Sequence, residues 1–297
     1  MKALLDIPIP THYDSATMPP SPRVLLSIDY EPWFALLRRY DHMLDSAQRC
    51  ELDGGFTADA LDPILEKLGD AKASFYLVGE IADWHSGVPG KIVGAGHELG
   101  LHCQTHRHLN DLNELAADIQ ASAGWRRHFS VRGYRAPMVG IRESAYAVLE
   151  AAGFYYSSSI YAPAGTLLRK GGVWELPVST LRLFGRDAMY TAPRDFSMRL
   201  LSRGELPYGS SFSIGLMGGQ VLRILERELK AGRSPVIILH PYELVPPANW
   251  PARIARDLLL NPLLWPFTWN KAAFLADLVR DFPISPLGTY LDEAVKS

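Results

Sequence analysis

The sequence predicts an α/β protein that folds as a closed or partly closed (β/α) barrel. Apolar runs of strand length alternate with helical patterns from residue 23 onward, which is typical of βα units and a parallel sheet. The units follow one another without an internal repeat or a linker, and this favours one barrel over two domains. Residues 1–22 are rich in Pro, Thr and Ser and are expected to form an irregular lead-in, so the barrel domain is expected to span 23–297.

The strands are expected where apolar residues run together between polar or turn-forming residues. The segment 23–28 is mostly apolar and short, as a buried strand requires. The predicted strands, in chain order, are 23–28, 73–78, 98–101, 131–134, 154–158, 173–178 and 235–239.

Helical spacing of apolar residues marks the segments between these strands. Residues 57–69 carry three leucines and an isoleucine at helical intervals, with Thr57 as the expected N-cap and Gly69 as the stop. The remaining predicted helices are 110–129 (capped by Asn110 or Asp111), 143–152 (ended by Gly153), 220–231 (ended by Gly232) and 270–281.

Composition excludes several classes of protein. The chain has 30 basic and 32 acidic residues and a net charge of −2, which argues against a nucleic-acid binder that works by neutralising phosphates. Its two cysteines, Cys50 and Cys103, are too few for a disulfide scaffold, and we expect reduced thiols. With no signal-peptide core and no run of about 18 apolar residues, a cytoplasmic location is expected.

Two stretches do not follow the βα pattern. Residues 180–216 have scattered Pro, Gly and Ser and are interpreted as an irregular insertion that shapes a substrate groove. Residues 258–267 are apolar, are broken by two prolines and have Arg253, Arg256 and Lys271 nearby. A contact with a membrane surface would fit this stretch, but a helix packed against the barrel is the preferred interpretation.

Two carboxylates follow the first predicted strand. Side chains alternate between the faces of a strand, so Asp29 and Glu31 point the same way. Two carboxylates on one face repel each other unless a cation or a proton lies between them. Acids in a solvated loop are the alternative interpretation for this pair.

Histidines are concentrated after the third predicted strand. Four of the nine histidines lie between positions 97 and 108, and His102 and His106 are four apart, so on a helical turn they would share one face. Two imidazoles at this spacing commonly hold zinc or a similar divalent ion. For His97 and His108 we expect turn or surface positions instead.

Polar residues also follow two further strands. Arg135 follows the fourth predicted strand and has the fork geometry that orients and holds a carboxylate. His240 directly follows the buried run 236–239, where a catalytic histidine would stand. In a parallel barrel these strand ends meet, so they supply metal ligands, a base, an Arg to hold it and an acid. These are the parts of a metal-assisted hydrolase.

The strand-end segments resemble the motifs of polysaccharide deacetylases (carbohydrate esterase family 4, the NodB-homology domain). The family segment GHEIGxHxxxH is matched by Gly96 to His102 and then His106. Further matches to the family's segments are IDYE at 28–31, YRAP at 134–137, LHPYE at 239–243 and WELPV at 174–178. The resemblance spans residues 23–290, and the four main motifs occur in the family's order.

This resemblance implies a distorted (β/α) barrel, often seven-stranded, with a divalent metal that is usually zinc. It implies removal of an N-acyl group, above all acetyl, from an amino sugar or polysaccharide. The implied metal ligands are Glu31, His102 and His106. The other implied roles are Asp29 as base, Arg135 as its partner, His240 as acid, the Met138 N–H as an oxyanion contact, and Trp33, Tyr134 and Pro137 as sugar-pocket residues.

The chain departs from the family pattern in its first and fourth motifs. The first motif often carries Asp where this chain has Glu31, which still offers a carboxylate oxygen. The fourth motif usually supplies an Asp near the acid His, and Ser157 stands there, so Glu175 is the candidate to tune His240. Two alternatives stay open: a related C–N hydrolase acting on a cyclic amide, a ureide or a formyl group, and a non-catalytic glycan-binding protein on the same fold.

Overall fold

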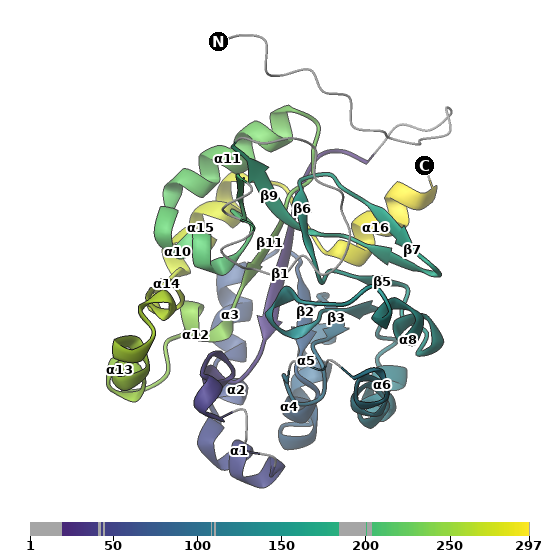
Figure 1. The fold of residues 1–297 in the computed structure, drawn as a ribbon. Coiled ribbons are helices and arrows are strands. Elements are labelled where there is room, and N and C mark those ends of the chain that lie inside the picture. Colours follow the sequence, from purple (N-terminus) through teal and green to yellow (C-terminus); the bar gives the residue numbers. More distant parts are fainter. Residues whose placement is uncertain are drawn as a thin grey trace.

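A curved sheet of mostly parallel strands runs through the centre of the molecule in this computed structural model, which describes residues 20–40, 43, 45–107, 109, 111–183, 200 and 204–296 (Figure 1). The strands of this nine-stranded sheet follow the order β11-β1-β2-β3-β4-β5-β8-β7, and β12 also pairs with β1. The pairs from β11 to β8 are parallel, whereas β7 is antiparallel to β8 at the edge. The strands are β1 (Val24–Tyr30), β2 (Ser74–Leu77), β3 (Glu98–Leu101), β4 (Gly133–Tyr134), β5 (Tyr156–Ser157), β7 (Leu168–Lys170), β8 (Val173–Glu175), β11 (Val236–Leu239) and β12 (Ile284–Ser285).

A second, three-stranded sheet lies beside β11 and partly closes the barrel. It consists of β6 (Tyr161–Pro163), β9 (Val178–Arg182) and β10 (Glu205–Leu206). The backbone of Gly209 bridges the two sheets, because its N–H donates to Ser179 O at 2.9 Å and its carbonyl accepts from the Ile238 N–H at 2.8 Å. A Cβ at this position would lie 2.3 Å from the Val236 carbonyl oxygen, so the bridge requires glycine.

Helices surround the main sheet, with α11 and α15 on one side of Figure 1 and α6 and α8 on the other. No helix in the described part of the chain is long and apolar enough to cross a membrane. The helices are α1 (Ser46–Asp53), α2 (Phe56–Asp59), α3 (Leu61–Leu68), α4 (Gly79–Trp84), α5 (Gly87–Gly94), α6 (Leu112–Ala121), α7 (Ala123–His128), α8 (Ala145–Ala151), α10 (Ser211–Met217), α11 (Gly219–Lys230), α12 (Pro241–Leu244), α13 (Trp250–Leu260), α14 (Trp265–Thr268), α15 (Ala272–Asp281) and α16 (Leu287–Lys296).

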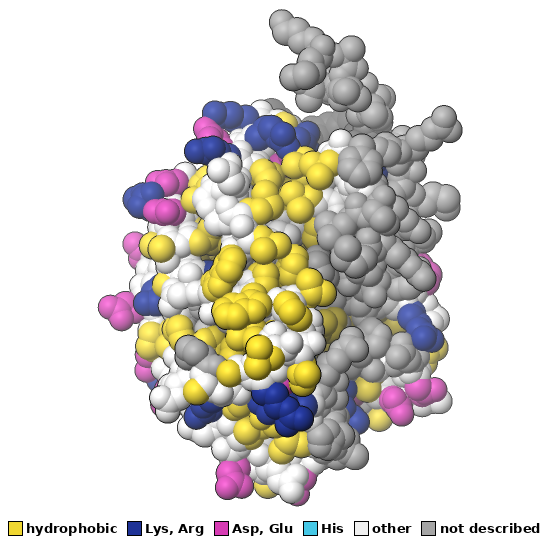
Figure 2. Space-filling view, turned by 60° about the vertical axis from the view of Figure 1, so that its left-hand side comes forward, with side chains coloured by type: hydrophobic (Ala, Val, Ile, Leu, Met, Phe, Trp, Pro, Cys, Tyr) yellow, Lys and Arg dark blue, Asp and Glu magenta, His cyan; other side chains and the backbone are white. Residues whose placement is uncertain are grey.

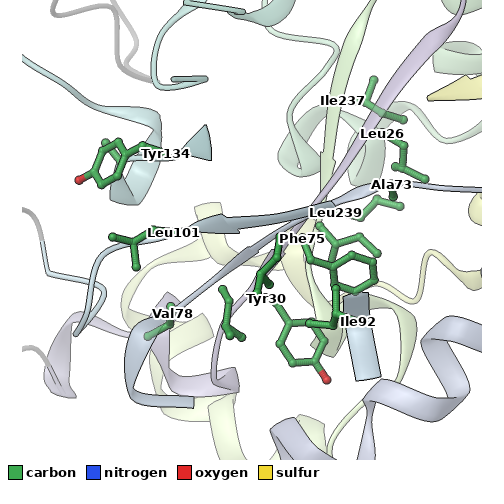
Figure 3. Close-up of a cluster of buried hydrophobic side chains, with 14 of the residues drawn as sticks. Leu26, Tyr30, Ala73, Phe75, Val78, Ile92, Leu101, Tyr134, Ile237 and Leu239 are labelled. Atoms are coloured by element: carbon green, nitrogen blue, oxygen red, sulfur yellow. The ribbon is translucent and has the colours of Figure 1, made fainter. Parts of the chain in front are cut away.

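The core divides into two layers because side chains alternate along each strand. Leu26, Ile28 and Tyr30 of β1 belong to the large cluster between the sheet and the outer helices, part of which Figure 3 shows. Leu25 belongs to a separate cluster inside the barrel, which includes Tyr76 and, from β11, Val236 and Ile238. Burial of each large apolar side chain contributes about 1.5–3 kcal/mol. The inner face therefore also receives the odd-numbered polar residues of β1.

The expected α/β barrel and its seven predicted strands are confirmed, with small shifts at their ends. The expected Thr57 cap is wrong, because the first helical turn there, α2, begins at Phe56 and Thr57 donates its N–H and hydroxyl to Asp53 instead. The expected helix 110–129 is two helices, α6 and α7, which meet at Ser122, whose hydroxyl donates to Gln104. Asp111 caps α6 as expected.

Several elements were not predicted. The helices α1, α4, α5, α10 and α16 were missed, as was the pair β6–β9. For 258–267 a helix packed against the barrel was the preferred interpretation, and the structure has the end of α13 and most of α14 in this stretch. Most of the lead-in 1–22 and about half of the insertion 180–216 lie outside the described residues. Within the insertion, β10 and α10 are regular elements. Cys50 and Cys103 are both free thiols, as expected.

Candidate active site

The predicted site residues stand at the carboxyl ends of neighbouring parallel strands. Asp29 lies at the end of β1 and Glu31 just after it, while His102, Arg135 and His240 directly follow β3, β4 and β11. Ile28, Leu101 and Leu239 immediately precede Asp29, His102 and His240, and their side chains lie in the outer layer. Because side chains alternate along a strand, the site residues point to the inner face. The chain thus collects two carboxylates, an Arg and two imidazoles at one end of the barrel, which is where ligands bind in parallel barrels.

Glu31, His102 and His106 form a cluster that can hold a metal ion. Their ligand atoms all lie within 4.8 Å of one another. Glu31 Oε2 is 2.7 Å from His106 Nε2 and 3.4 Å from His102 Nε2, and the two imidazole rings are 4.7 Å apart. One carboxylate with two imidazoles is a donor set typical of zinc and similar divalent ions.

The convergence of His102 and His106 does not come from a helical turn, as the sequence spacing suggested. The segment after β3 is a bent loop in which Cys103 and His106 have φ values of 58° and 52°, the left-handed region. The Gly79 and Glu80 backbone N–H groups donate to the carbonyls of Cys103 and Gln104 and anchor this loop. A Cβ at Gly79 would lie 2.1 Å from Gln104 Oε1 and 2.7 Å from Ser122 Oγ, so a larger residue there would displace the Gln104 side chain.

Hydrogen bonds behind the ligands orient them. His102 Nδ1 lies 2.9 Å from the Arg135 carbonyl oxygen. A carbonyl can only accept, so Nδ1 carries the proton and Nε2 keeps its lone pair directed at the cluster. Tyr242 donates its hydroxyl to Glu31 Oε1 at 2.9 Å and leaves Oε2 to the histidines. The residues present therefore fit a divalent metal.

Asp29 lies beside this cluster in an ion pair with Arg135. Arg135 Nη1 is 3.2 Å from Asp29 Oδ1, and Arg135 is fully buried. Arg135 Nη2 donates to Ser27 Oγ and Ser158 Oγ, at 3.2 and 2.9 Å, and the guanidinium lies 4.5 Å from the centre of the Tyr76 ring. Asp29 Oδ2 is 3.8 Å from His102 Nε2. The ion pair with Arg135 therefore holds the Asp29 carboxylate next to the proposed metal ligands, while Asp29 itself is not one of them.

His240 lies on another side of the cluster, with a buried acid behind it. Its Nε2 is 3.9 Å from Glu31 Oε1, and its Nδ1 is 3.3 Å from Glu243 Oε2. Glu243 is fully buried, accepts the backbone N–H of His240 at 2.9 Å and pairs with Lys271 at 2.7 Å. No role of its own was predicted for Glu243, although it stands in the LHPYE segment.

The local charges shift the pKa values of these groups in the direction that a metal and acid site requires. Burial works against the charged form of Glu31, but His106, His240 and His102 lower the pKa of its carboxyl well below the ordinary value. Burial also opposes the charged form of His240, but Glu243 and Glu31 raise the pKa of His240 to about 9. Glu31 is therefore ionised and His240 protonated at neutral pH.

The expected acid-tuning role of Glu175 is not what the structure shows. Glu175 accepts the Ser159 N–H at 2.6 Å and the Tyr146 hydroxyl at 2.9 Å, both away from His240. The carboxylate beside His240 is Glu243. Glu175 is the register partner of Ser157 across β5 and β8, and the Ser157 side chain hydrogen-bonds to its carboxylate. The Glu175 carboxylate is therefore bound by these residues and not by the His240 imidazole.

The expected sugar-pocket residues are mostly buried. Tyr134 is wrong as a pocket residue, because the alternation along β4 turns it into the outer layer, where its hydroxyl lies 3.0 Å from Cys103 Sγ (Figure 3). Trp33 is buried beneath Arg253, and Pro137 is buried too. Met138 is exposed, with a φ of 58°. The contact of Trp33, Pro137 and Met138 with substrate stays a prediction.

Two other histidine expectations have different outcomes. His97 was expected in a turn or on the surface, but it is buried, with Nδ1 accepting the Ala73 N–H and its ring 5.0 Å from that of Phe75. The physical reason is that His97 has the parity of Leu99 and so faces the outer helix layer. His108 lies outside the described residues.

The fold and the strand-end cluster together define an α/β barrel with a candidate metal site at the carboxyl ends of its strands. No family model and no curated protein sequence matches the chain. Among solved structures it is similar to Puue allantoinase, with a TM-score of 0.52, 16% identity, and coverage of 89% of this chain and 91% of that chain.

Two further similarities lie at slightly lower TM-scores. A protein from Mycobacterium smegmatis described as a polysaccharide deacetylase has a TM-score of 0.49 and 18% identity, with 91% of this chain and 96% of that chain covered. A CE4 family pseudoenzyme from Bacillus anthracis has a TM-score of 0.49 and 13% identity, with 93% of this chain and 67% of that chain covered. At these identities the similarity concerns the fold alone. The expected α/β barrel is thus confirmed as a fold, one of the kind found in Puue allantoinase.

Proposed function

We propose that the chain is a metal-dependent hydrolase that removes an N-acyl group, above all acetyl, from an amino sugar or polysaccharide. The observation that supports this most is the meeting of Glu31, His102 and His106 within 4.8 Å, flanked by Asp29 and His240. Zinc is the metal that this donor set favours. A bound divalent ion would supply Lewis acidity and a water of lowered pKa.

The residues of the chain would act on the two sides of the amide. Asp29, held by Arg135, takes a proton from the water whose oxygen adds to the acyl carbon. The Met138 N–H donates to the oxyanion that forms, an interaction on the order of 3–4 kcal/mol for a well-placed donor. His240, protonated at neutral pH because its pKa is raised to about 9, gives its proton to the sugar nitrogen as the C–N bond breaks. The products are a carboxylic acid and a free amine.

A second candidate is hydrolysis of a cyclic amide or ureide. The fold similarity to Puue allantoinase supports it, because that protein's name gives a ureide substrate and its TM-score is above 0.5. Loss of a formyl rather than an acetyl group is a variant of the first proposal. The non-catalytic alternative rests on Ser157 in place of an expected Asp, and the buried Glu243 beside His240 weakens it.

The experiment that tests the proposal is a substrate screen with metal-reconstituted protein. N-acetyl and N-formyl amino sugars, chitooligosaccharides, peptidoglycan fragments and allantoin are incubated with protein loaded with Zn²⁺ or Co²⁺, and released acid or ring-opened product is measured. We expect acid from an N-acylated sugar and none after chelation. Ring opening of allantoin without acid release would transfer the assignment to the second candidate, and inactivity on the whole panel in every metal form would contradict both.

A further inference from the structure

One face of the molecule exposes large apolar side chains next to the candidate site. Leu259 and Leu260 at the end of α13 are 84% and 74% exposed. We call the following exposed residues the apolar face: Leu216 of α10, Leu259 and Leu260 of α13, Leu263, Trp265 of α14 and Trp269. Figure 2 shows hydrophobic side chains gathered along this side of the molecule.

The same elements bury one set of apolar residues and expose another. Trp250, Ile254 and Leu258 of α13 pack with Trp33 in a buried cluster, which is the contact with the barrel expected from the sequence. Leu259 and Leu260 continue the apolar run past the point where packing ends. Scattered exposed leucines are ordinary, but several large ones together on one face mark a contact surface.

The apolar face is bordered by positive charge. Arg253 and Arg256 of α13 are exposed. The acid on this helix, Asp257, is neutralised by Arg39 at 3.1 Å, and from 245 to 270 the sequence has no other Asp or Glu. Arginines beside exposed Leu and Trp form the combination that binds the headgroup region of an anionic bilayer. Trp265 and Trp269 have the amphipathic rings that favour this region.

The apolar face leads directly to the candidate active site. The Phe267 ring is 6.1 Å from the His240 ring and two residues from Trp265. Trp250 lies 5.6 Å from Tyr242, which donates to Glu31. A surface that contacts the apolar face would therefore lie close to the proposed acid and the proposed ligand set.

We propose that the apolar face rests on an anionic phospholipid bilayer and places the site at the bilayer surface. The substrate class that follows is an N-acyl amino sugar carried on a lipid. This substrate class rests on the function proposed above, whereas the membrane contact does not. Leu, Trp and Arg in this arrangement lie in the interface and do not span it.

A second copy of the chain fits the apolar face less well. A twofold contact places the same patch on both partners, so Arg253 and Arg256 would meet an identical basic and apolar surface. No exposed acid from 245 to 270 is available to pair with them across such a contact. An anionic bilayer supplies the missing negative charge.

Vesicle flotation of the full chain tests the contact without reference to catalysis. Wild-type protein is mixed with vesicles of phosphatidylcholine containing phosphatidylglycerol, or of phosphatidylcholine alone. We expect wild type to float with the anionic vesicles, and the double variant Leu259→Glu/Leu263→Glu to stay at the bottom of the gradient. Val93→Glu is the matched control, because Val93 is exposed on α5 away from the apolar face, and it should float like wild type. Arg256→Gln should weaken binding about fivefold, since one basic residue near an anionic surface is lost.

The remaining outcomes separate this inference from the proposed function. Wild type that fails to float while it deacylates soluble N-acyl sugars overturns the membrane contact and leaves the function in place. Flotation without hydrolysis of any substrate supports the contact and contradicts the function. Sedimentation that shows a wild-type dimer, a monomeric double variant and no vesicle binding identifies the face as a dimer contact and overturns the inference. With a vesicle-anchored N-acetylglucosaminyl lipid, the double variant should lose turnover but keep wild-type turnover on the soluble sugar.

Discussion

Strand β3 carries a buried histidine at each end, and the two have opposite surroundings. His97 precedes the strand at its amino end, and His102 follows it at its carboxyl end. The two are five positions apart, so the alternation of a strand turns them to opposite faces. His97 faces the outer layer, next to Phe75, and accepts a backbone N–H. His102 faces the barrel interior, beside Asp29 and Glu31.

The difference teaches how the barrel divides its tasks. At the amino end, the half-buried acid of β3, Glu98, accepts hydrogen bonds from the Ser74 hydroxyl and the Gly288 N–H. This end of the strand therefore has a structural role. At the carboxyl end, acids and imidazoles are left facing one another around a space that an ion fits. Substitutions at the two ends should therefore separate stability from metal binding and turnover.

The largest effect is expected from His102→Ala. This variant removes one of three ligand side chains, so the protein should lose its bound metal and its turnover should fall about a thousandfold or more. Metal content by mass spectrometry and the rate on the best N-acyl substrate measure this. His97→Ala is the matched variant at the other end of β3, and it should retain the metal but unfold at lower denaturant. Retention of a full metal equivalent by His102→Ala would break the comparison.

A somewhat smaller effect is expected from Asp29→Asn. Loss of the proposed base should lower kcat by about a hundred- to ten-thousandfold, while the metal stays because Asp29 is not in the ligand set. Asp53→Asn is the control, since Asp53 is a buried carboxylate that binds Thr57 away from the site. Near-normal turnover in Asp29→Asn would require another base.

Glu243→Gln should act through His240 and lower kcat about ten- to a hundredfold, as loss of an orienting partner does. It also leaves Lys271 buried without its carboxylate, which costs stability. The double variant Glu243→Gln/Lys271→Met should recover stability in urea unfolding but not turnover. Glu143→Gln breaks an exposed pair with Lys170. It should change the free energy of unfolding by no more than about 1 kcal/mol and kcat by no more than about twofold. Recovery of both stability and turnover in the double variant would make Glu243 a purely structural residue.

The smallest effect concerns His97 and pH. Burial, together with Lys72, lowers the pKa of His97 to about 4, against about 6.5 in the unfolded chain. Between these values the unfolded state binds more protons, so the free energy of unfolding should fall as pH drops from about 6.5 towards 4. In urea titrations at several pH values, His97→Gln should show a shallower fall over this window. If the free energy of unfolding of wild type fell no more steeply with pH than that of the variant, the pKa of His97 would be the same in the folded and unfolded states.

Much of the fold and part of the site followed from local sequence. The strands were predictable because a short apolar run between turn residues is typical of a buried strand. The shared direction of Asp29 and Glu31 was predictable because side chains alternate between the two faces of a strand. Alternation also predicts the outward direction of Tyr134, which the resemblance to the deacetylase motifs obscured. The pairing of His240 with Glu243 was missed although the two residues are only three positions apart. What no local pattern predicts is Lys271, which reaches Glu243 from 28 residues away. The ion pair of Arg135 with Asp29, 106 residues apart, was expected from the resemblance and not from any local pattern.

By itself, the sequence determined which side chains stand at the strand ends and which face each one shares, because strand periodicity is a property of the local backbone. The tertiary structure decided how His106 turns back to Glu31 and which lysine holds Glu243 behind His240. It also decided that Leu259, Leu260, Leu263, Trp265 and Trp269 remain exposed beside the site. These depend on loop conformation and on packing between distant segments. Such contacts form when the barrel closes, and no local pattern specifies them.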